Sequence, residues 1–121
     1  GIDIVRGQIR IAAGEQLRCT QDDIKCSDHA LECRITAEDA LRNFLPCPGT
    51  VTSLHLPHGL GLRIDEGIYE GYKIPFYYDP LLLKLMTWGK TRDEAISRMK
   101  RTVDEMRIEG IKTILPFHRV V

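Results

Sequence analysis

Apolar residues at the start of the chain are spaced for one face of a helix. Between Ile2 and Ala13 they recur at steps of three and four residues, and Gly14 follows as a terminator. A capping residue is missing before the first turn, so its backbone N–H groups lack partners. Because the chain also stops while still apolar, we expect a piece of a longer polypeptide.

Alternating apolar and polar residues predict strands in the middle of the chain. Residues 29–35 alternate clearly, and the "VTSLHL" run at 51–56 and the "GLRID" run at 61–65 follow. The "LLLKLMTWG" run at 81–89 is almost wholly apolar, which predicts a strand buried on both faces. Residues 73–75 are expected to add a short pairing.

Helical signals lie between and after these strands. Thr36, with Asp39 three residues on, predicts the start of a short helical turn, and the prolines and glycine of 44–49 predict an irregular connection. Thr91 is a predicted N-cap for a long helix that ends near Glu109. A last helical segment is expected after residue 113.

These elements together predict an α+β domain. We expect a small antiparallel sheet, curled into part of a barrel and flanked by the N-terminal helix and the long helix that starts at Thr91. The pattern contains no internal repeat, and we expect a single domain.

Composition narrows the possible functions. The chain has 121 residues, of which 43% are hydrophobic and 28% charged, as in soluble globular proteins. Lys and Arg number 17, as do Asp and Glu, so no net charge attracts nucleic acid or an anionic membrane. The sequence has neither a membrane-spanning apolar run nor a signal-peptide pattern. We expect a soluble, cytoplasmic protein with no nucleic-acid or membrane partner.

Common catalytic and metal-binding signals are missing. The four cysteines, at positions 19, 26, 33 and 47, form no C-x-x-C pair, so we expect thiols and no metal site. The four histidines are scattered among separate elements. Because the G-x-x-x-x-G-K-[ST], H-E-x-x-H and G-x-S-x-G motifs are also absent, we expect no catalytic residue in this chain.

Two other patterns have simple explanations. Gly59 and Gly61 resemble a phosphate loop, but a strand follows them instead of the helix that such a loop needs. Four tyrosines lie between residues 69 and 78 without a run of interleaved basic residues. We expect these tyrosines to pack the core and loop instead of stacking on bases.

Arg63 has an unusual setting among the basic residues. In the "LGLRIDEG" stretch, 60–67, the apolar residues alternate and Arg63 points to the opposite face. A guanidinium beside glycines offers a rigid fork of donors to a small anion. An ion pair with Asp65 or Glu66 is the simpler interpretation.

Six blocks, in order, resemble the C-terminal domain of biotin carboxylase, the ATP-grasp component of acetyl-CoA, propionyl-CoA and pyruvate carboxylases. The blocks are "GIDIVRGQIRIAAGE" (1–15), "HALECRITAED" (29–39), "FLPCPG" (44–49), "LRID" (62–65), "YEGYKIPFYYDPLLLKL" (69–85) and "EGIKT" (109–113). The second and fifth blocks argue against a carbamoyl-phosphate-type ligase, which shares ATP-grasp chemistry.

The resemblance implies a function for the parent chain. In that family, ATP and bicarbonate give carboxyphosphate, whose carbon dioxide is transferred to biotin on a carrier domain, and the C-terminal domain closes one side of the site. The arginine of the family's matching strand contacts bicarbonate and the biotin ureido oxygen, which implies this role for Arg63. A guanidinium fork suits a planar anion, and a fixed cation stabilises the developing negative charge.

The resemblance also implies what the chain lacks. The family's ATP-binding, metal-binding and "E-x-N-x-R" segments belong upstream of Gly1, so we expect residues 1–121 to be the C-terminal domain of a longer chain. Alone it should be inactive and bind no ATP, Mg²⁺ or biotin. The implied partners are the ATP-grasp portion, a biotin carboxyl carrier domain, a carboxyltransferase and a second copy in a homodimer, with Arg92 near that interface. The alternative is a non-catalytic assembly module, and the acyl acceptor stays open.

Overall fold

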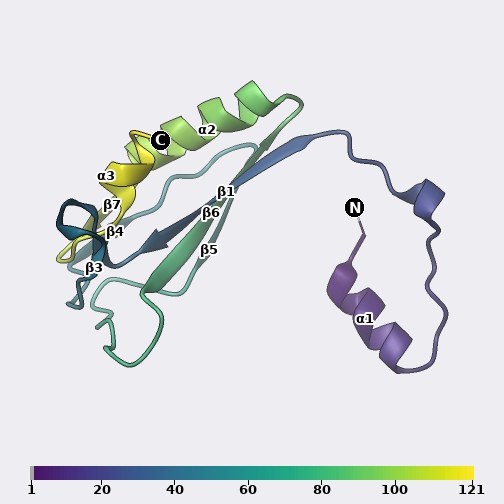
Figure 1. Ribbon diagram of the computed structural model, residues 1–121, viewed down its shortest axis with the longest axis horizontal. Helices are drawn as coiled ribbons and strands as arrows, with labels where there is room; N and C mark the ends of the chain where they lie inside the picture. Colours follow the sequence, from purple (N-terminus) through teal and green to yellow (C-terminus); the bar gives the residue numbers. More distant parts are fainter. Residues whose placement is uncertain (1) are drawn as a thin grey trace.

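The computed structural model describes residues 2–121 and contains short and long helices around small antiparallel sheets (Figure 1). In chain order the elements are α1 (Ile4–Ala12), η1 (Gln21–Asp23), β1 (His29–Thr36), β2 (Glu38–Asp39), η2 (Ala40–Arg42), β3 (Leu45–Pro46), β4 (Ser53–His55), β5 (Leu62–Glu66), β6 (Leu81–Gly89), α2 (Arg92–Glu105), β7 (Arg107–Glu109) and α3 (Leu115–His118). The α3 helix confirms the predicted last helical segment.

The main sheet is built around β6, which is hydrogen-bonded on both sides. It pairs antiparallel with β1 on one side and with β5 on the other. Leu82 and Leu83 are both buried, and neighbouring strand residues point to opposite faces. The predicted strand buried on both faces is therefore confirmed along this part of β6.

The long helix α2 covers one face of the main sheet (Figure 1). Thr91 caps it as predicted, since its hydroxyl accepts a hydrogen bond from the Glu94 N–H at 3.2 Å. Ala95, Met99 and Val103 are buried along one side of the helix, at the spacing that the sequence predicts. Met99 and Val103 pack with Ile35, Val51, Leu83 and Leu85 in the hydrophobic core.

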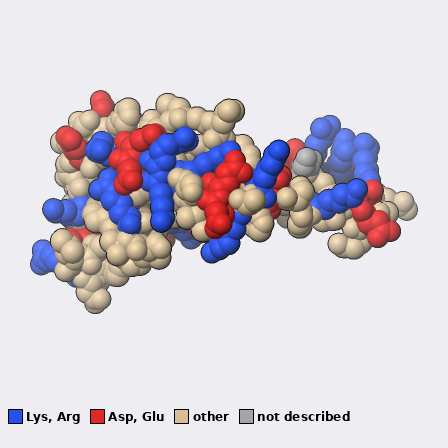
Figure 2. Space-filling model, turned by 90° about the horizontal axis from the view of Figure 1, so that it is seen from above, with Lys and Arg blue, Asp and Glu red and all other residues tan. Residues whose placement is uncertain are grey.

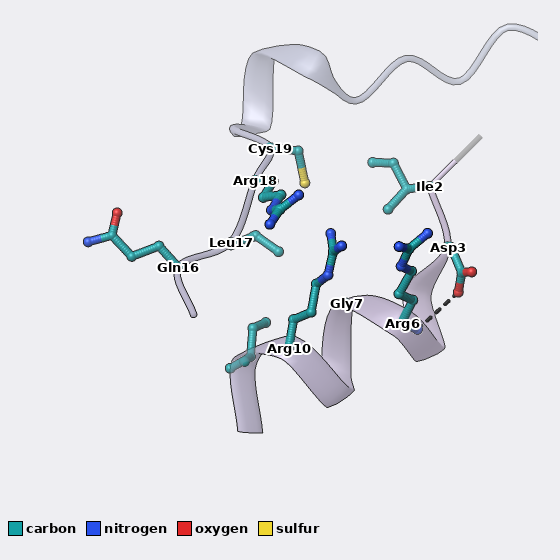
Figure 3. Close-up of a pocket in the computed structure, with 10 residues that line it drawn as sticks. Ile2, Asp3, Arg6, Gly7, Arg10, Gln16, Leu17, Arg18 and Cys19 are labelled. Carbon is teal, nitrogen blue, oxygen red and sulfur yellow. Dashed lines mark hydrogen bonds between the residues drawn. The ribbon is translucent and has the colours of Figure 1, made fainter. Parts of the chain in front are cut away.

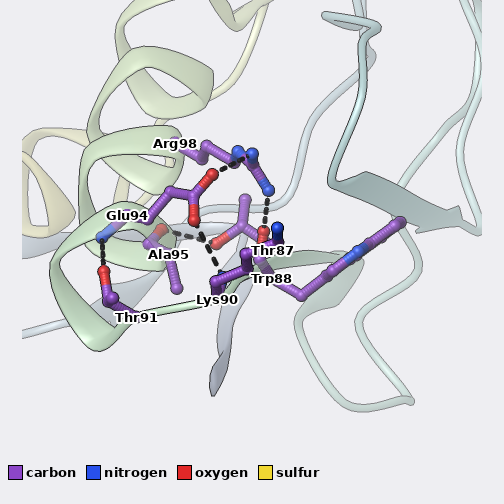
Figure 4. Close-up of polar contacts among 7 residues, drawn as sticks. All are labelled: Thr87, Trp88, Lys90, Thr91, Glu94, Ala95 and Arg98. Carbon is purple, nitrogen blue, oxygen red and sulfur yellow. Dashed lines mark hydrogen bonds and ion pairs between the residues drawn. The ribbon is translucent and has the colours of Figure 1, made fainter. Parts of the chain in front are cut away.

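A polar cluster joins the end of β6 to the first turns of α2 (Figure 4). The buried Thr87 hydroxyl donates to the Ala95 carbonyl at 2.9 Å. The Glu94 carboxylate accepts from the Lys90 N–H at 2.8 Å and pairs with Arg98, which also donates to a carbonyl at the end of β6. The bonds of Thr87 to Ala95 and of Arg98 to the β6 carbonyl link strand to helix, and the bond from Lys90 to Glu94 stiffens the turn between them. The cluster therefore holds α2 against the sheet.

The end of α2 differs from the sequence prediction. The helix does not continue to Glu109, because it ends at Glu105 and the chain becomes extended at Met106. The Met106 side chain is almost fully buried, and β7 then pairs with β4. The pairing of β7 with a distant strand replaces further helical turns. Gly110 follows β7 with a φ of +91°.

The turn after β1 also begins later than predicted. Thr36 is not a helix cap, because β1 continues through it to pair with Leu81, and its hydroxyl donates to Glu38. Asp39 instead caps the single turn η2 by accepting from the Leu41 N–H at 3.0 Å. The predicted short helical turn is thus present, with a different cap.

The remaining strand predictions are confirmed with shifted bounds. The predicted strand at 51–56 is β4, and that at 61–65 is β5. Residues 73–75 contribute one bridge, between Lys73 and Thr50.

The N-terminal helix α1 stands apart from the main sheet, to which an extended segment joins it (Figure 1). Asp3 caps the helix, because its carboxylate accepts from the Arg6 N–H at 3.0 Å. The prediction that the helix lacks a cap is therefore wrong, since it begins at Ile4 and not at Ile2. None of the residues from Ile4 to Ala12 is buried.

The predicted fold class, α+β with a small antiparallel sheet, is confirmed. The main sheet stays open and does not close into a barrel, and two-stranded pairs accompany it. A separate finding concerns membranes: in the described part of the chain, every helix is too short or too polar to cross one.

We expect Gly110→Ala to destabilise the chain more than Gly71→Ala. Both glycines have positive φ, at +91° and +88°, a conformation that costs about 1 kcal/mol for alanine. A Cβ on Gly110 would also lie 2.1 Å from the Thr50 carbonyl oxygen, whereas a Cβ on Gly71 has open space. Urea unfolding should show losses of about 1 kcal/mol for Gly71→Ala and roughly 2–4 kcal/mol for Gly110→Ala. Equal losses would contradict the close packing of Gly110.

Candidate functional site

Arg63 lies on the outer face of β5 and forms an ion pair with its neighbour Asp65. The Nε–Oδ1 distance is 2.8 Å and the Nη2–Oδ2 distance is 3.0 Å, so the contact is bidentate. The Arg63 side chain is 66% exposed. The ion pair that the sequence suggests as the simpler interpretation is thus present, and it occupies one edge of the guanidinium fork.

The pair changes the ionisation of both side chains. Hydrogen bonds from Arg63 hold the pKa of the Asp65 carboxyl below its ordinary value, and the Lys84 charge lowers it further. The same bonds raise the pKa of Arg63. Asp65 is therefore ionised, and Arg63 cationic, throughout the neutral range.

Strand pairing extends this charged surface across the main sheet. Residues that face each other in an antiparallel pair point to the same side. One row consists of Arg34 on β1, Lys84 on β6 and Asp65 on β5. The next row consists of Glu32, Met86 and Arg63. We call these six residues the charged face.

Arg34 is the second arginine of the charged face, and its local sequence pattern does not single it out as a candidate site residue. Its side chain is 66% exposed, and its Nε lies 3.5 Å from Glu32 Oε1, at the outer limit of a hydrogen bond. Within residues 2–121, Nη1 and Nη2 of Arg34 have no hydrogen-bond partner. The terminal N–H groups of Arg34 are therefore more available to a ligand than those of Arg63. The alternation of "HALECRIT" places Arg34 on the polar side of a strand, but it does not show which strands lie beside it.

The tyrosines lie differently from the prediction. Tyr72 is half-buried against the core and packs edge-on against Tyr69, with ring centroids 5.3 Å apart. Tyr77 and Tyr78, with Phe76, are exposed on the loop before β6. The core-packing prediction therefore holds for Tyr72 and is wrong for Tyr77 and Tyr78.

Other candidate residues are dispersed. His118 Nε2 lies 2.9 Å from the Arg34 carbonyl oxygen and so helps to hold the edge of β1. The cysteines are free thiols, and burial raises the pKa of Cys33. Gly59 and Gly61 precede β5, so a strand follows them as predicted. Among the described residues, no three His, Cys, Asp or Glu side chains are grouped as a metal site would need.

The charged face can bind a small planar anion. It presents two guanidinium groups and one ammonium group to solvent, partly neutralised by two carboxylates. Because β1 and β5 are two strand spacings apart, roughly 10 Å, an anion held by one arginine leaves room for a second group nearby. The molecule is thus an α+β domain with an open sheet face that carries arginines.

Comparisons with known proteins identify the family. A family model described as the biotin carboxylase C-terminal domain matches residues 32–121. The chain therefore belongs to the biotin carboxylase C-terminal domain family.

Relatives from two bacteria match nearly the whole chain. The biotin carboxylase of Haemophilus influenzae is 50% identical over 121 residues, which are 100% of this chain. Biotin carboxylase 1 of Bacillus subtilis is 49% identical over 118 residues, which are 98% of this chain. The matched residues are 27% and 26% of the two relatives, so the chain spans about a quarter of their length.

Solved structures agree with these relatives. The chain is similar to the biotin carboxylase domain of a thermophilic 2-oxoglutarate carboxylase bound to bicarbonate, with a TM-score of 0.95 and 42% identity. The match covers 99% of this chain and 27% of that one. It is also similar to the multifunctional pyruvate carboxylase of Rhizobium etli, at 44% identity, with a TM-score of 0.93 over 98% of this chain and 12% of that one.

We expect the Asp65 carboxyl to titrate below the ordinary Asp range and to return toward that range in Arg63→Ala. Because its folded-state pKa is depressed, Asp65 contributes stability above its unfolded pKa and loses it as pH falls through the folded pKa. Carbon-detected NMR titration measures this pKa directly. Arg34→Ala is the matched control and should leave the Asp65 pKa unchanged. A normal Asp65 pKa in the unmutated chain would show that the pair does not persist in solution.

Proposed function

We propose that this chain is the C-terminal domain, residues 1–121, of a biotin carboxylase that uses ATP and bicarbonate to carboxylate biotin on a carrier domain. The family match over residues 32–121 carries the proposal. The similarity to a biotin carboxylase domain bound to bicarbonate, at 42% identity, supports it. In this proposal the domain closes one side of the active site, and the domain alone is inactive.

The charged face is the proposed contribution of this domain to the site. Bicarbonate is a planar anion, and the biotin ureido oxygen gains negative charge as biotin is deprotonated. In this proposal an arginine of the charged face binds bicarbonate through its guanidinium N–H donors. The same donors stabilise the negative charge on the ureido oxygen. This chain would thus orient substrate and stabilise charge, with no proton transfer assigned to it.

Two arginines are candidates for that contact. Arg63 is the residue that the family resemblance predicts, but Asp65 occupies one edge of its fork. Arg63 would bind an anion through its remaining N–H groups or by exchange with Asp65. Arg34 lies on the same face with both terminal nitrogens free of partners within residues 2–121, and so needs no exchange. Arg34 is therefore a second candidate for the anion contact.

ATP and Mg²⁺ are proposed to bind the ATP-grasp portion of the parent chain. A related structure contains ADP, magnesium and bicarbonate. The family resemblance places the ATP-binding and metal-binding segments before Gly1, so the proposal assigns neither ATP nor metal ligands to this chain.

The remaining partners follow from the same proposal. The biotin carboxyl carrier domain delivers biotin, and a carboxyltransferase uses the product, in the cytoplasm. A related biotin carboxylase domain was solved as a dimer, which supports a homodimer here. Arg92, the first residue of α2, is the residue proposed to lie near that interface. A non-catalytic assembly module is the alternative, and the charged face argues against it.

We expect removal of the anion-contacting arginine to lower ATP- and bicarbonate-dependent biotin carboxylation by on the order of 10²-fold. The parent polypeptide is assayed with free biotin as unmutated protein, Arg63→Ala and Arg34→Ala. Arg101→Ala is the control, because Arg101 forms an exposed ion pair with Glu105 on the separate helix α2.

Each outcome assigns the contact. Loss of biotin carboxylation in Arg63→Ala supports the prediction from sequence. Loss of activity in Arg34→Ala alone would assign the anion contact to Arg34 on β1. If all three variants keep full activity, the charged face is not part of the site. If the unmutated parent does not carboxylate biotin, the proposed function itself is wrong.

A further inference from the structure

Lys84 lies on β6, at the centre of the charged face. In the strand register it stands between Arg34 on β1 and Asp65 on β5. Lys84 is half-buried, and within residues 2–121 its ammonium group forms no ion pair. A cation that is partly removed from water is stabilised by a carboxylate partner. Lys84 is therefore available to a carboxylate on a neighbouring strand.

Asp65 faces Lys84 directly across the pairing of β5 with β6. Residues that face each other in this way point to the same side and have Cβ atoms about 4.5–5.5 Å apart, within reach of a lysine side chain. The hydrogen bonds from Arg63 lower the pKa of the Asp65 carboxyl most, and the Lys84 charge lowers it further. Lys84 thus acts on Asp65 even while Asp65 is bound to Arg63.

A carboxylate shared by two cations occurs elsewhere in the chain. Basic side chains gather at the α1 end of the molecule (Figure 2). Arg10 and Arg18 there line a hollow of about 320 Å³ (Figure 3). The Glu15 carboxylate lies 3.2 Å from Arg18 Nη2 and 3.8 Å from Arg10 Nε. Two cations can therefore stay within ion-pair distance of one carboxylate, as an exchange between them requires.

An exchange of this kind would favour anion binding at Arg63. Asp65 accepts from Nε and Nη2, which form one edge of the Arg63 guanidinium. While Asp65 holds this edge, an incoming anion meets a partly neutralised arginine and a carboxylate that repels it. The apparent affinity for the anion is reduced by the fraction of Arg63 that is free of Asp65. A second cation that draws Asp65 away raises this fraction.

We propose that Lys84 is a positioning residue, whose ammonium group takes the Asp65 carboxylate from Arg63 when bicarbonate binds, so that the whole guanidinium fork faces the anion. This inference rests on the proposed function, with Arg63 as the anion contact. Before binding, Arg63 has Asp65 as its partner and Lys84 has none within residues 2–121. After binding, Arg63 pairs with bicarbonate and Lys84 with Asp65. Lys84 acts through Asp65 and does not itself touch bicarbonate.

Arg34 is less suited to receive the Asp65 carboxylate. It lies on β1, two strand spacings or roughly 10 Å from β5, whereas Lys84 lies on the adjacent strand. The Arg34 Nε also lies 3.5 Å from a carboxylate of its own strand, that of Glu32. The register therefore assigns the exchange to Lys84.

The test varies bicarbonate in the carboxylation of free biotin by the full parent polypeptide. Lys84→Met keeps an unbranched side chain and removes the charge. We expect the KM for bicarbonate to rise on the order of tenfold with kcat within about twofold, because saturating anion still displaces Asp65. Lys84→Arg, which can still accept the Asp65 carboxylate, should restore most of the affinity. Lys100→Met is the matched control, because Lys100 is exposed on α2, which covers the other face of the main sheet.

Asp65→Asn shows whether Lys84 acts through Asp65. In that variant no carboxylate competes for Arg63, so the addition of Lys84→Met should leave the KM for bicarbonate unchanged. A further rise in KM would mean that Lys84 binds the anion directly, which would overturn the proposal. A fall in kcat and Tm without a change in KM would show a structural role for Lys84 and would overturn it too.

The unmutated parent separates this inference from the proposed function. If it carboxylates biotin and Lys84→Met has the same KM for bicarbonate, the exchange is wrong and the proposed function stands. If the unmutated parent does not carboxylate biotin, the proposed function is wrong and the exchange is wrong with it.

Discussion

The pairing of β6 on both edges is the constraint on which the rest of the structure depends. One strand receives β1 and β5, and its inward side chains form the base on which α2 packs. A one-residue slip in either pairing would move every side chain of that strand to the other face. Apolar burial under α2 therefore fixes the register, and the register fixes which charges meet on the open face. The packing of the core and the composition of the charged face are two results of one pairing.

The ion pair on β5 orients an exposed arginine with little loss of conformational entropy. Asp65 lies two residues from Arg63 on the same strand face, so the contact requires little chain ordering beyond the strand itself. An exposed pair of this kind contributes little to stability. Its effect is geometric, because it restricts the guanidinium to one orientation. The same contact uses N–H donors that an external anion would need, so a fixed orientation of Arg63 reduces the number of its available donors. Within residues 2–121, Nη1 and Nη2 of Arg34 have no such partner.

The sequence predicted the features that depend on local chemistry. Thr91 caps the helix by a hydrogen bond within the first turn, and the apolar run of β6 is by itself a sign that the strand is buried. Predictions failed where a distant segment decided the outcome. The helix ends before Met106 because β7 pairs with β4, and Thr36 is extended because it pairs with β6. Arg63 was found from its own strand and from family resemblance, whereas the position of Arg34 beside Lys84 requires the sheet register, which no local pattern contains.

The charged face and the helix α1 lie on different parts of the chain and differ in what holds them in place. The residues of the charged face lie on strands that backbone pairing keeps in register. Helix α1 has nine residues, none of them buried, and a helix of this length gains little stability from propensity alone. The sheet register therefore decides which charges meet on the charged face, whereas within residues 2–121 no comparable packing supports α1.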